Sequence, residues 1–444
     1  MNNWLIRNAD IVNEGRRFQG DVRIRNGRID AIAPALTAQA GEREFDAAGR
    51  LLLPGMIDDQ VHFREPGLEH KGDFFTESRA AAAGGVTTFF EMPNSKPTTT
   101  DYAALADKVE RASRRSLANF AFYFGATNDN LELIRNLDPT AACGVKIFMG
   151  ASTGNMLVDN PDTLAGIFRD APVPVVTHCE DTPTIEANLA AERAKYGDAI
   201  PIQRHPYIRS REACIKSTRL AIDLARRHGT RLHVLHISTA DELALFEPGP
   251  IEGKRITAET CVHFLHFDEA DYATLGNLIK CNPAIKSAAD RSAIIAALRD
   301  GRIDVLATDH APHTLEEKSQ SYEKAPSGLP LVQFVLQCAL ERWFAGDLPL
   351  ETIVERAMHA PARLFGVRER GFLREGYWAD LTLIDPAKPQ TVTRDAVISK
   401  CGWSPFEGHT FRSSIAATWI NGHLAWDGAR LDDSQLGQRV EFDR

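Results

Sequence analysis

Five residues of a type found in metal centres are spread along the chain, and each lies within or just after an apolar, β-rich run. They are His62, Lys146, His178, His236 and Asp309. A single histidine has a structural role more often than a catalytic one. Equivalent strand ends of a closed parallel sheet meet at one mouth, however, and imidazole and carboxylate groups are the usual ligands of zinc. The set therefore predicts one shared metal site.

Lys146 lies among apolar neighbours in the run GVKIFMG, which has the pattern of a buried strand. A buried, unpaired ammonium group is very costly. Two interpretations follow from the residues alone. Either Lys146 forms an ion pair, with Asp309 as the expected partner, or its pKa falls until the neutral amine can react.

The strand-like runs alternate with helix-like stretches through the middle of the chain. In order, the runs are MIDDQVHF, VTTFFEM, FAFYFGA, GVKIFMG, VPVVTH, RLHVLHI, ITAETCV and IDVLATDH. Eight such alternations predict an α/β fold of the (β/α)₈ TIM barrel type. In such a barrel the active site is built at the carboxyl ends of the strands, where the polar residues fall.

Both ends of the chain have a different pattern, with short alternating strands and tight turns. An Asn26-Gly27 hairpin signal lies in the N-terminal part, and ADLTLID (379–385) and TWINGHLAW (418–426) follow near the C-terminus. This pattern is typical of a β-sandwich. We expect a small discontinuous β-sandwich domain of residues 1–54 and 370–444, and a barrel of residues 55–369.

Composition excludes several classes of protein. The chain has 444 residues, is 43% hydrophobic and carries a net charge of −9, so it can bury a large core but lacks the basic surface of a nucleic-acid binder. It has no apolar run of membrane-spanning length and no signal-peptide pattern at its start. The seven cysteines are scattered without CxxC spacing. We expect a cytoplasmic protein that acts on a small molecule and has reduced thiols.

Seven segments resemble, in order, the dihydroorotase branch of the amidohydrolase superfamily. They are LLLPGMIDDQVHFREPG, EMPNSKPTT, GVKIFMG, THCED, LHIST, CNPAIK and ATDHAPH. The resemblance covers nearly the whole chain. It implies reversible cyclisation of N-carbamoyl-L-aspartate to L-dihydroorotate, a step of de novo pyrimidine (UMP) biosynthesis.

The resemblance also implies a binuclear zinc centre, held by an HxH pair, a bridging carboxylated lysine, two later histidines and an aspartate. Carried onto this chain, the metal ligands are Gln60, His62, Lys146, His178, His236 and Asp309. Lys146 would then be carboxylated by CO₂. A zinc-activated hydroxide would attack the ring amide, and Asp309 would act as general base and then as general acid.

The resemblance also implies which residues bind the substrate. They are His62, Arg64, Asn94, Asn282 and His313, together with the backbone around Ser327 and Gly328. The fork-shaped Arg64 side chain suits a substrate carboxylate. Simpler interpretations remain for some of these residues. Arg64 could form a surface ion pair with Glu65, and Asn94 and Ser327-Gly328 could be turn residues.

One position departs from the family pattern, because Gln60 replaces the first histidine of the HxH pair. A neutral amide oxygen is a poorer zinc ligand than imidazole. The neighbouring Asp59 does not compensate if side chains alternate regularly, since alternation places it with Phe63 on the face opposite Gln60 and His62 unless a bulge intervenes. One or two zinc ions per chain are therefore expected.

Two alternatives to a dihydroorotase remain open. One is a related cyclic amidase of the allantoinase or hydantoinase type, against which Arg64 counts. The other is a non-catalytic homologue that partners aspartate transcarbamoylase, although only one ligand position is altered here. We also expect a homo-oligomer, with a dimer as the commonest state. The small-residue segment 151–156 is predicted to form a mobile loop over the mouth.

Overall fold

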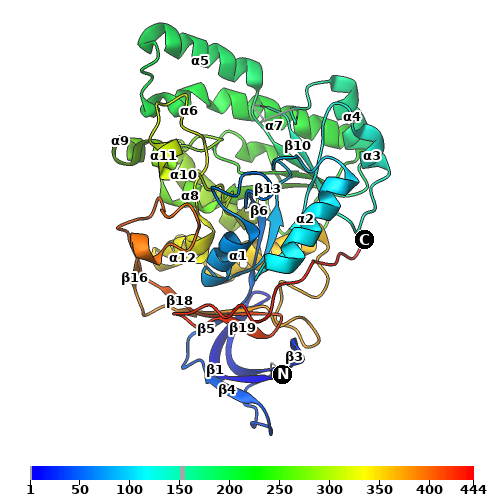
Figure 1. The fold of residues 1–444 in the computed structure, drawn as a ribbon, viewed down its shortest axis with the longest axis vertical. Helices are drawn as coiled ribbons and strands as arrows, with labels where there is room; N and C mark the ends of the chain where they lie inside the picture. The colour runs from blue at the N-terminus through cyan, green and yellow to red at the C-terminus, as the bar shows by residue number, and fades with distance from the viewer. Residues whose placement is uncertain (1–2, 151–155) are drawn as a thin grey trace.

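The computed structural model describes residues 3–150 and 156–444. Within these ranges a ring of parallel strands is surrounded by helices, and a separate, mostly antiparallel sheet lies at one end (Figure 1). The predicted (β/α)₈ barrel with a sheet-rich domain built from both chain ends is confirmed, and the strands expected to form a β-sandwich are hydrogen-bonded into one continuous sheet. Among the helices of these ranges, none is long and apolar enough to cross a membrane.

The barrel strands pair in parallel, and each of the eight predicted runs contains one of them. The third is divided in two, so the strands are β6 (Met56–Val61), β7 (Val86–Glu91), β8 (Asn119–Phe122), β9 (Phe124–Gly125), β10 (Val145–Phe148), β11 (Val175–His178), β12 (Leu232–Val234), β13 (Ile256–Cys261) and β14 (Val305–Ala307). His310, just after β14, forms a parallel bridge with Val61 of β6. This contact closes the ring.

Helices follow the strands around the barrel, and several of them begin at a residue whose side chain caps the first turn. They are α1 (Phe74–Ala83), α2 (Tyr102–Arg115), α3 (Leu131–Arg135), α4 (Pro161–Asp170), α5 (Thr182–Tyr196), α6 (His205–Ile208), α7 (Arg211–His228), α8 (Val262–His266), α9 (Tyr272–Leu275), α10 (Ala288–Asp300), α11 (Leu315–Lys318), α12 (Val335–Phe344), α13 (Leu350–Val354) and α14 (Ala360–Phe365). In α10, for example, Ser287 caps the first turn and Gly301 ends the helix in a left-handed conformation.

The small β domain is one sheet made from both ends of the chain. Its strands are β1 (Trp4–Asn13), β2 (Arg16–Arg25), β3 (Arg28–Ala33), β4 (Arg43–Asp46), β5 (Leu51–Pro54), β15 (Leu381–Asp385), β18 (Ser414–Ile420) and β19 (His423–Trp426). A separate pair, β16 (Gln390–Thr391) and β17 (Thr410–Phe411), lies between β15 and β18 in sequence. Both residues of Asn26-Gly27 have positive φ, as a tight hairpin turn requires, and so do both residues of Asn421-Gly422 between β18 and β19.

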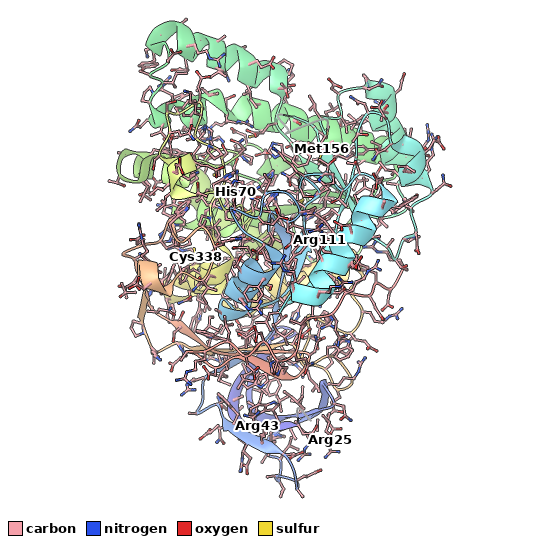
Figure 2. All side chains as sticks on the ribbon, viewed as in Figure 1. Arg25, Arg43, His70, Arg111, Met156 and Cys338 are labelled. Carbon is pink, nitrogen blue, oxygen red and sulfur yellow. The ribbon has the colours of Figure 1, made fainter. Side chains whose placement is uncertain are left out.

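The two parts of the molecule meet where β5 runs into β6 after a single residue, so the small β domain adjoins the start of the barrel sheet. His70 and Met156, in segments that follow β6 and β10, lie away from Arg25 and Arg43 of the small β domain (Figure 2). The carboxyl end of the barrel therefore opens away from this domain. The domain boundaries at residues 54 and 370 stay a proposal.

Candidate active site

A cavity of about 430 Å³ opens at the carboxyl ends of the barrel strands. Its walls include every residue that the sequence assigned to the site: Gln60, His62, Arg64, Asn94, Lys146, His178, His236, Asn282, Asp309, His313, Ser327 and Gly328. Residues separated by more than 260 positions in the chain are thus brought into one cavity. Of the predicted loop 151–156, residues 151–155 lie outside the described residues.

Three site residues have a left-handed backbone, which is uncommon for residues other than glycine. The φ angles are 73° at Arg64, 41° at His236 and 51° at Asp309. Such conformations persist only where the surroundings hold them in place. They let the chain turn sharply at the end of a strand, so that successive side chains reach different parts of the mouth.

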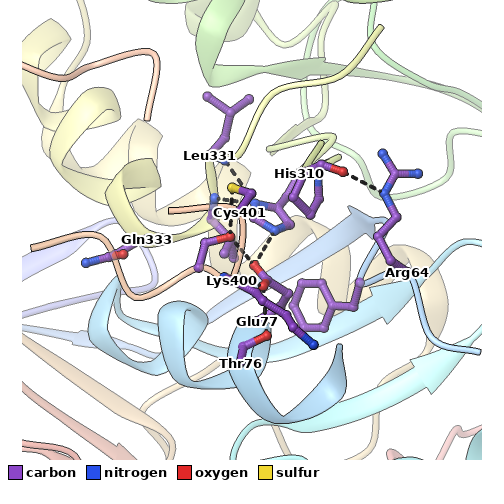
Figure 3. Close-up of polar contacts among 12 residues, drawn as sticks. Arg64, Thr76, Glu77, His310, Leu331, Gln333, Lys400 and Cys401 are labelled. Carbon is purple, nitrogen blue, oxygen red and sulfur yellow. Dashed lines mark hydrogen bonds and ion pairs between the residues drawn. The ribbon is translucent and has the colours of Figure 1, made fainter. Parts of the chain in front are cut away.

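A buried hydrogen-bond network holds the backbone beside Asp309. The ring of His310 accepts hydrogen bonds from the backbone N–H groups of Leu331 and Val332 at its Nδ1, and its Nε2–H donates to Glu77 at 2.9 Å. Figure 3 shows this network, with Arg64 extending away from it. His310 therefore holds the end of the strand in place, and it does not line the cavity.

His178 and His236 face each other across the mouth. His178 Nδ1 is 3.0 Å from His236 Nε2, and the other ring nitrogen of His178 is 3.0 Å from Glu180 Oε2. Glu180 also forms an ion pair with Arg209. Burial lowers the pKa of both histidines, so both rings are neutral at pH 7. With its Nε2–H donated to Glu180, His178 directs a lone pair at His236, an arrangement that suits a shared cation.

His62 and Asp309 make the same kind of pair on the opposite wall. His62 Nδ1 lies 2.7 Å from the amide oxygen of Asn94, and His62 Nε2 lies 3.1 Å from Asp309 Oδ1. Since an amide oxygen only accepts, a neutral His62 presents a lone pair to the carboxylate, whereas a protonated His62 donates to it. Burial opposes ionisation of Asp309, but the hydrogen bond and charge of a protonated His62 outweigh it and lower the pKa of Asp309 to about 2. Asp309 is therefore an ionised carboxylate.

Lys146 is 1% exposed and has no carboxylate partner in the part of the chain that is described; its Nζ lies 4.8 Å from the centre of the Phe148 ring. The ion pair with Asp309 that the sequence left open is thus absent from residues 3–150 and 156–444. Burial lowers the pKa of Lys146 to about 8. About a tenth of the amine is then neutral at pH 7, and a reaction with CO₂ needs this neutral form.

The strand that carries Gln60 departs from the expected alternation. The pairing of β6 with β7 shifts register between Asp58 and Val61. Asp59 Oδ2 lies 3.4 Å from His233 Nε2 of β12, and since β13 and β14 separate β12 from β6, the two side chains meet inside the barrel. Asp59 does not line the cavity, but regular alternation does not describe its position, because this irregularity turns it toward the barrel interior, as the expectation allowed for a bulge.

Gln60 itself donates from its amide nitrogen to Asp309 Oδ1 at 3.1 Å, while its amide oxygen lies 3.9 Å from Cys261 Sγ. In this orientation Gln60 orients the Asp309 carboxylate. Ligation of a metal requires the amide oxygen to face the site, so its role as a ligand stays a prediction.

Arg64 is a buried cation on the cavity wall. Its Nε donates to the carbonyl oxygen of Pro312 at 3.0 Å, and Nη2 lies 3.0 Å from His313 Nε2. Throughout the described ranges no carboxylate pairs with it, although only 8% of the residue is exposed. The alternative of an ion pair with Glu65 is not realised, because Glu65 pairs with Arg115 at 2.7 Å. Its charge is therefore left for a ligand.

Two cations on this wall were not predicted from the sequence. Lys71 and Lys96 line the cavity beside Arg64, and Lys71 Nζ lies 3.1 Å from His313 Nδ1 and 2.9 Å from Glu317. The residue type does not distinguish a binding lysine from any other lysine in a loop. Only their positions in the loops that follow β6 and β7, where the active sites of such barrels are built, could have indicated a role in binding. Together these cations can bind an anion.

The remaining wall carries polar groups suited to a planar ring. Asn282 Oδ1 is buried and has no hydrogen-bond partner in the described parts of the chain. Gly328 has a φ of +144°, and a Cβ there would lie 2.5 Å from the carbonyl oxygen of Ala311. Lys318 Nζ binds the carbonyl oxygens of Pro326 and Gly328 at 3.0 Å each. The Ser327-Gly328 segment is thus held firmly against the cavity.

Comparison with known proteins identifies the family. A sequence model described as the amidohydrolase family matches residues 51–425. The chain belongs to the amidohydrolase family. Among similar curated proteins, the dihydroorotase of Halobacterium salinarum is 35% identical over 416 residues, which cover 92% of this chain and 93% of that protein. The allantoinase of Solibacter usitatus is 35% identical over 447 residues, which cover 99% and 96%.

Solved structures of amidohydrolases also resemble this one. The L-hydantoinase (dihydropyrimidinase) from Arthrobacter aurescens superposes with a TM-score of 0.94 at 28% identity, covering 99% of this chain and 100% of that chain. Members of the family are generally metal-dependent. The donor set of this amidohydrolase fits a metal, because neutral imidazole lone pairs converge with an ionised carboxylate.

Proposed function

We propose that this amidohydrolase is a dihydroorotase, which reversibly cyclises N-carbamoyl-L-aspartate to L-dihydroorotate in de novo pyrimidine biosynthesis. The observation that carries the proposal is the buried guanidinium of Arg64, which lacks a carboxylate partner in the described residues and faces the cavity beside Lys71 and Lys96. A buried charge without a partner is strongly destabilising. The carboxylate of dihydroorotate would supply that partner.

Zinc, as one or two ions, would be held by His62, Lys146 in carboxylated form, His178, His236 and Asp309, with Gln60 as a further, weaker ligand. When bound, zinc polarises the ring carbonyl and increases the acidity of water. Asp309 would take up the proton that the attacking water loses and return it to the leaving ring nitrogen. Its low pKa supports the ionised state that the first of these transfers needs.

The other wall residues would orient the ring. Arg64, with Asn94 and His313, would bind the substrate carboxylate, because a guanidinium fork matches its two oxygens. The unpaired Oδ1 of Asn282 would accept a ring N–H, and the backbone around Ser327 and Gly328 would bind the remaining polar edge. The substrate would thus be held at two places, by its carboxylate and by the polar groups of its ring.

A cyclic amidase of the allantoinase or hydantoinase type is the second candidate. The 35% identity to an allantoinase and the likeness to an L-hydantoinase favour it. Neutral substrates such as allantoin and hydantoins carry no carboxylate, however, and would leave Arg64 without a partner. This difference in charge is the reason that we prefer dihydroorotate.

A substrate panel tests the proposal. The zinc-loaded full chain is assayed with L-dihydroorotate, allantoin and a 5-substituted hydantoin, and its zinc content is measured on the same sample. We expect turnover of dihydroorotate with a kcat/KM at least 100-fold above the other two. Turnover of allantoin or the hydantoin in its place would contradict the proposal. Absence of both turnover and zinc would favour a non-catalytic homologue that partners aspartate transcarbamoylase.

A further inference from the structure

A second group of metal-binding residues lies inside the barrel beneath the candidate active site. Asp59 of β6, His233 of β12 and Glu259 of β13 are each 0% exposed. Their ligand atoms all lie within 4.8 Å of one another. None of the three lines the active-site cavity, which is bounded at this point by Gln60 and His236. The group is therefore separate from the site described above.

The tautomer of His233 is fixed by Thr257. His233 Nδ1 lies 2.8 Å from Thr257 Oγ1, and the Thr257 hydroxyl donates its own proton to the carbonyl oxygen of Leu232 at 3.2 Å. The Thr257 oxygen must therefore accept the Nδ1–H of His233. A neutral His233 ring then carries its lone pair on Nε2, which faces the two carboxylates.

The polar atoms at the centre of the group are unpaired. Both carboxylate oxygens of Asp59, Nε2 of His233 and Oε2 of Glu259 lack a hydrogen-bond partner among residues 3–150 and 156–444. His233 Nε2 is 3.4 Å from Asp59 Oδ2 and 3.4 Å from Glu259 Oε2. Buried lone pairs that face each other are destabilising unless a proton or a metal cation lies between them.

We propose that Asp59, His233 and Glu259 bind a divalent cation, most suitably zinc, at a buried site distinct from the catalytic centre. Tetrahedral zinc with bonds of about 2.0–2.1 Å places neighbouring ligand atoms about 3.3–3.4 Å apart. Both separations from His233 Nε2 match this spacing. Two carboxylates and a neutral imidazole also balance the charge of the ion.

A proton is the competing occupant, since an imidazolium could lie between the two carboxylates. Charge-assisted N–H···O bonds draw their heavy atoms to about 2.7–2.9 Å. The separations of 3.4 Å are longer, and they are the same on both sides of Nε2. The geometry therefore favours an ion that is larger than a proton.

The irregularity in β6 is what completes this site. It turns Asp59 inward, one position before the residue at which the family's first HxH histidine is missing. The ion would join β6, β12 and β13 across the barrel. It would also support the active site from below, because the backbone N–H of His236 lies 3.4 Å from Glu259 Oε1.

Anomalous diffraction at the zinc edge, from crystals of the full chain purified with zinc, tests the proposal directly. We expect a peak bounded by Asp59, His233 and Glu259, in addition to any peak in the active-site cavity. Electron density without an anomalous peak there, in crystals whose active site is filled, would overturn the proposal and identify a protonated His233. This readout does not depend on which cyclic amide the enzyme hydrolyses.

Metal content of matched variants gives a second test. Asp59→Asn keeps the size of the side chain but removes an anionic ligand, and we expect the zinc content per chain to fall by one ion. Asp304→Asn is the control, because Asp304 is an equally buried carboxylate that pairs with Lys254 away from this group. Zinc content of Asp59→Asn equal to that of the wild type would overturn the proposal. If Asp59→Asn fails to fold, the wild-type anomalous peak decides.

Discussion

Three buried histidines each have one ring nitrogen fixed by a neighbour. His62 is held by Asn94, His178 by Glu180 and His233 by Thr257. The other ring nitrogens face Asp309, His236 and the pair of carboxylates of Asp59 and Glu259, respectively. Such partners set the tautomer of a metal-binding histidine and increase its basicity. Metal affinity should therefore depend on residues that touch no metal.

Glu180 gives the clearest test of this dependence. Replacing it with glutamine removes the charge that supports His178, so we expect the zinc affinity of the active site to fall about 10-fold. The affinity is measured by competition with a chromophoric chelator. Glu192→Gln is the control, since Glu192 pairs with Arg204 near the surface. Equal zinc affinities for wild type and Glu180→Gln would show that Glu180 is only structural.

Lys71 tests the anionic character of the substrate. Removal of its charge in Lys71→Met should raise KM for L-dihydroorotate about 10-fold, the equivalent of about 1.4 kcal/mol, with a smaller effect on kcat. The reason is that Lys71 adds to the positive potential around His313 without reaching the metal side of the cavity. Steady-state kinetics at constant ionic strength measures both constants. An unchanged KM would remove Lys71 from the binding wall.

Sequence alone identified most residues of the site, but not their supports. His178 and His236 were predictable because an apolar strand directly precedes each of them. Thr257 and Glu180 were not, because a hydrogen-bond partner is chosen by three-dimensional packing and has no fixed spacing. The pairing of Arg64 was decided in the same way, since Glu65 turned out to pair with Arg115.

At the scale of elements, regular alternation located the strands correctly but failed within β6. The register shift between Asp58 and Val61 inserts an irregularity that no hydrophobic pattern records, because all six residues of β6 are buried. Period-two alternation separates two faces only when one of them is exposed. The inward turn of Asp59 could therefore not be predicted, and the group that it forms with His233 and Glu259 was missed.

A π-helical turn, Glu355–His359, links the barrel to the small β domain through His359. His359 Nδ1–H donates to the carbonyl oxygen of Gly371 at 2.7 Å, and Nε2 accepts from the backbone N–H of Glu14 at 2.9 Å. The ring is therefore neutral in the folded state. Burial lowers its pKa from 6.5 to about 4.

The sign of the resulting pH dependence follows from proton uptake. Between about pH 6.5 and 4 the unfolded chain binds a proton at His359 and the folded chain does not, so stability is present above pH 6.5 and is lost as the pH falls. We expect this residue alone to lower the free energy of unfolding by about 2 kcal/mol between pH 7 and pH 5.

Urea unfolding at the two pH values, for wild type and His359→Gln, measures this contribution. The variant should lose about 2 kcal/mol less than the wild type over the interval, whatever its absolute stability. His70→Gln, a change at an exposed histidine, is the control and should leave the difference unaltered. Equal pH dependence for all three proteins would assign the acid sensitivity to other groups.

At the scale of the whole molecule, the two patterns of the sequence correspond to two parts of the fold. The eight strand-like runs form one closed ring, and the short alternating strands at the two chain ends form the small β domain. The path of the C-terminal segment was not predictable. Its residues Val440 and Phe442 leave the small β domain and join an apolar cluster with Phe90 and Phe365 of the barrel. A short segment with little regular structure has no periodicity from which to infer its contacts.

This segment should contribute strongly to the stability of the entire chain. The Phe442 ring is 4% exposed and lies 6.0 Å from the Phe90 ring, centre to centre. We expect Phe442→Ala to lower the free energy of unfolding by about 3–5 kcal/mol, as for other buried phenylalanines. Phe75→Ala is the matched control, since Phe75 is 43% exposed. Denaturant unfolding compares the two, and similar small losses would contradict a tightly packed segment.

The central claim is that the charge of Arg64 selects a substrate with a carboxylate, and one pair of variants tests it most directly. Arg64→Met removes the buried guanidinium, and Arg111→Met removes a surface guanidinium that pairs with Asp107. Measured as kcat/KM for L-dihydroorotate on zinc-loaded enzyme, Arg64→Met should lose about 100-fold or more, the equivalent of about 3 kcal/mol, while Arg111→Met stays near wild type. The account would be contradicted if the wild type turns over dihydroorotate and Arg64→Met has the same kcat/KM.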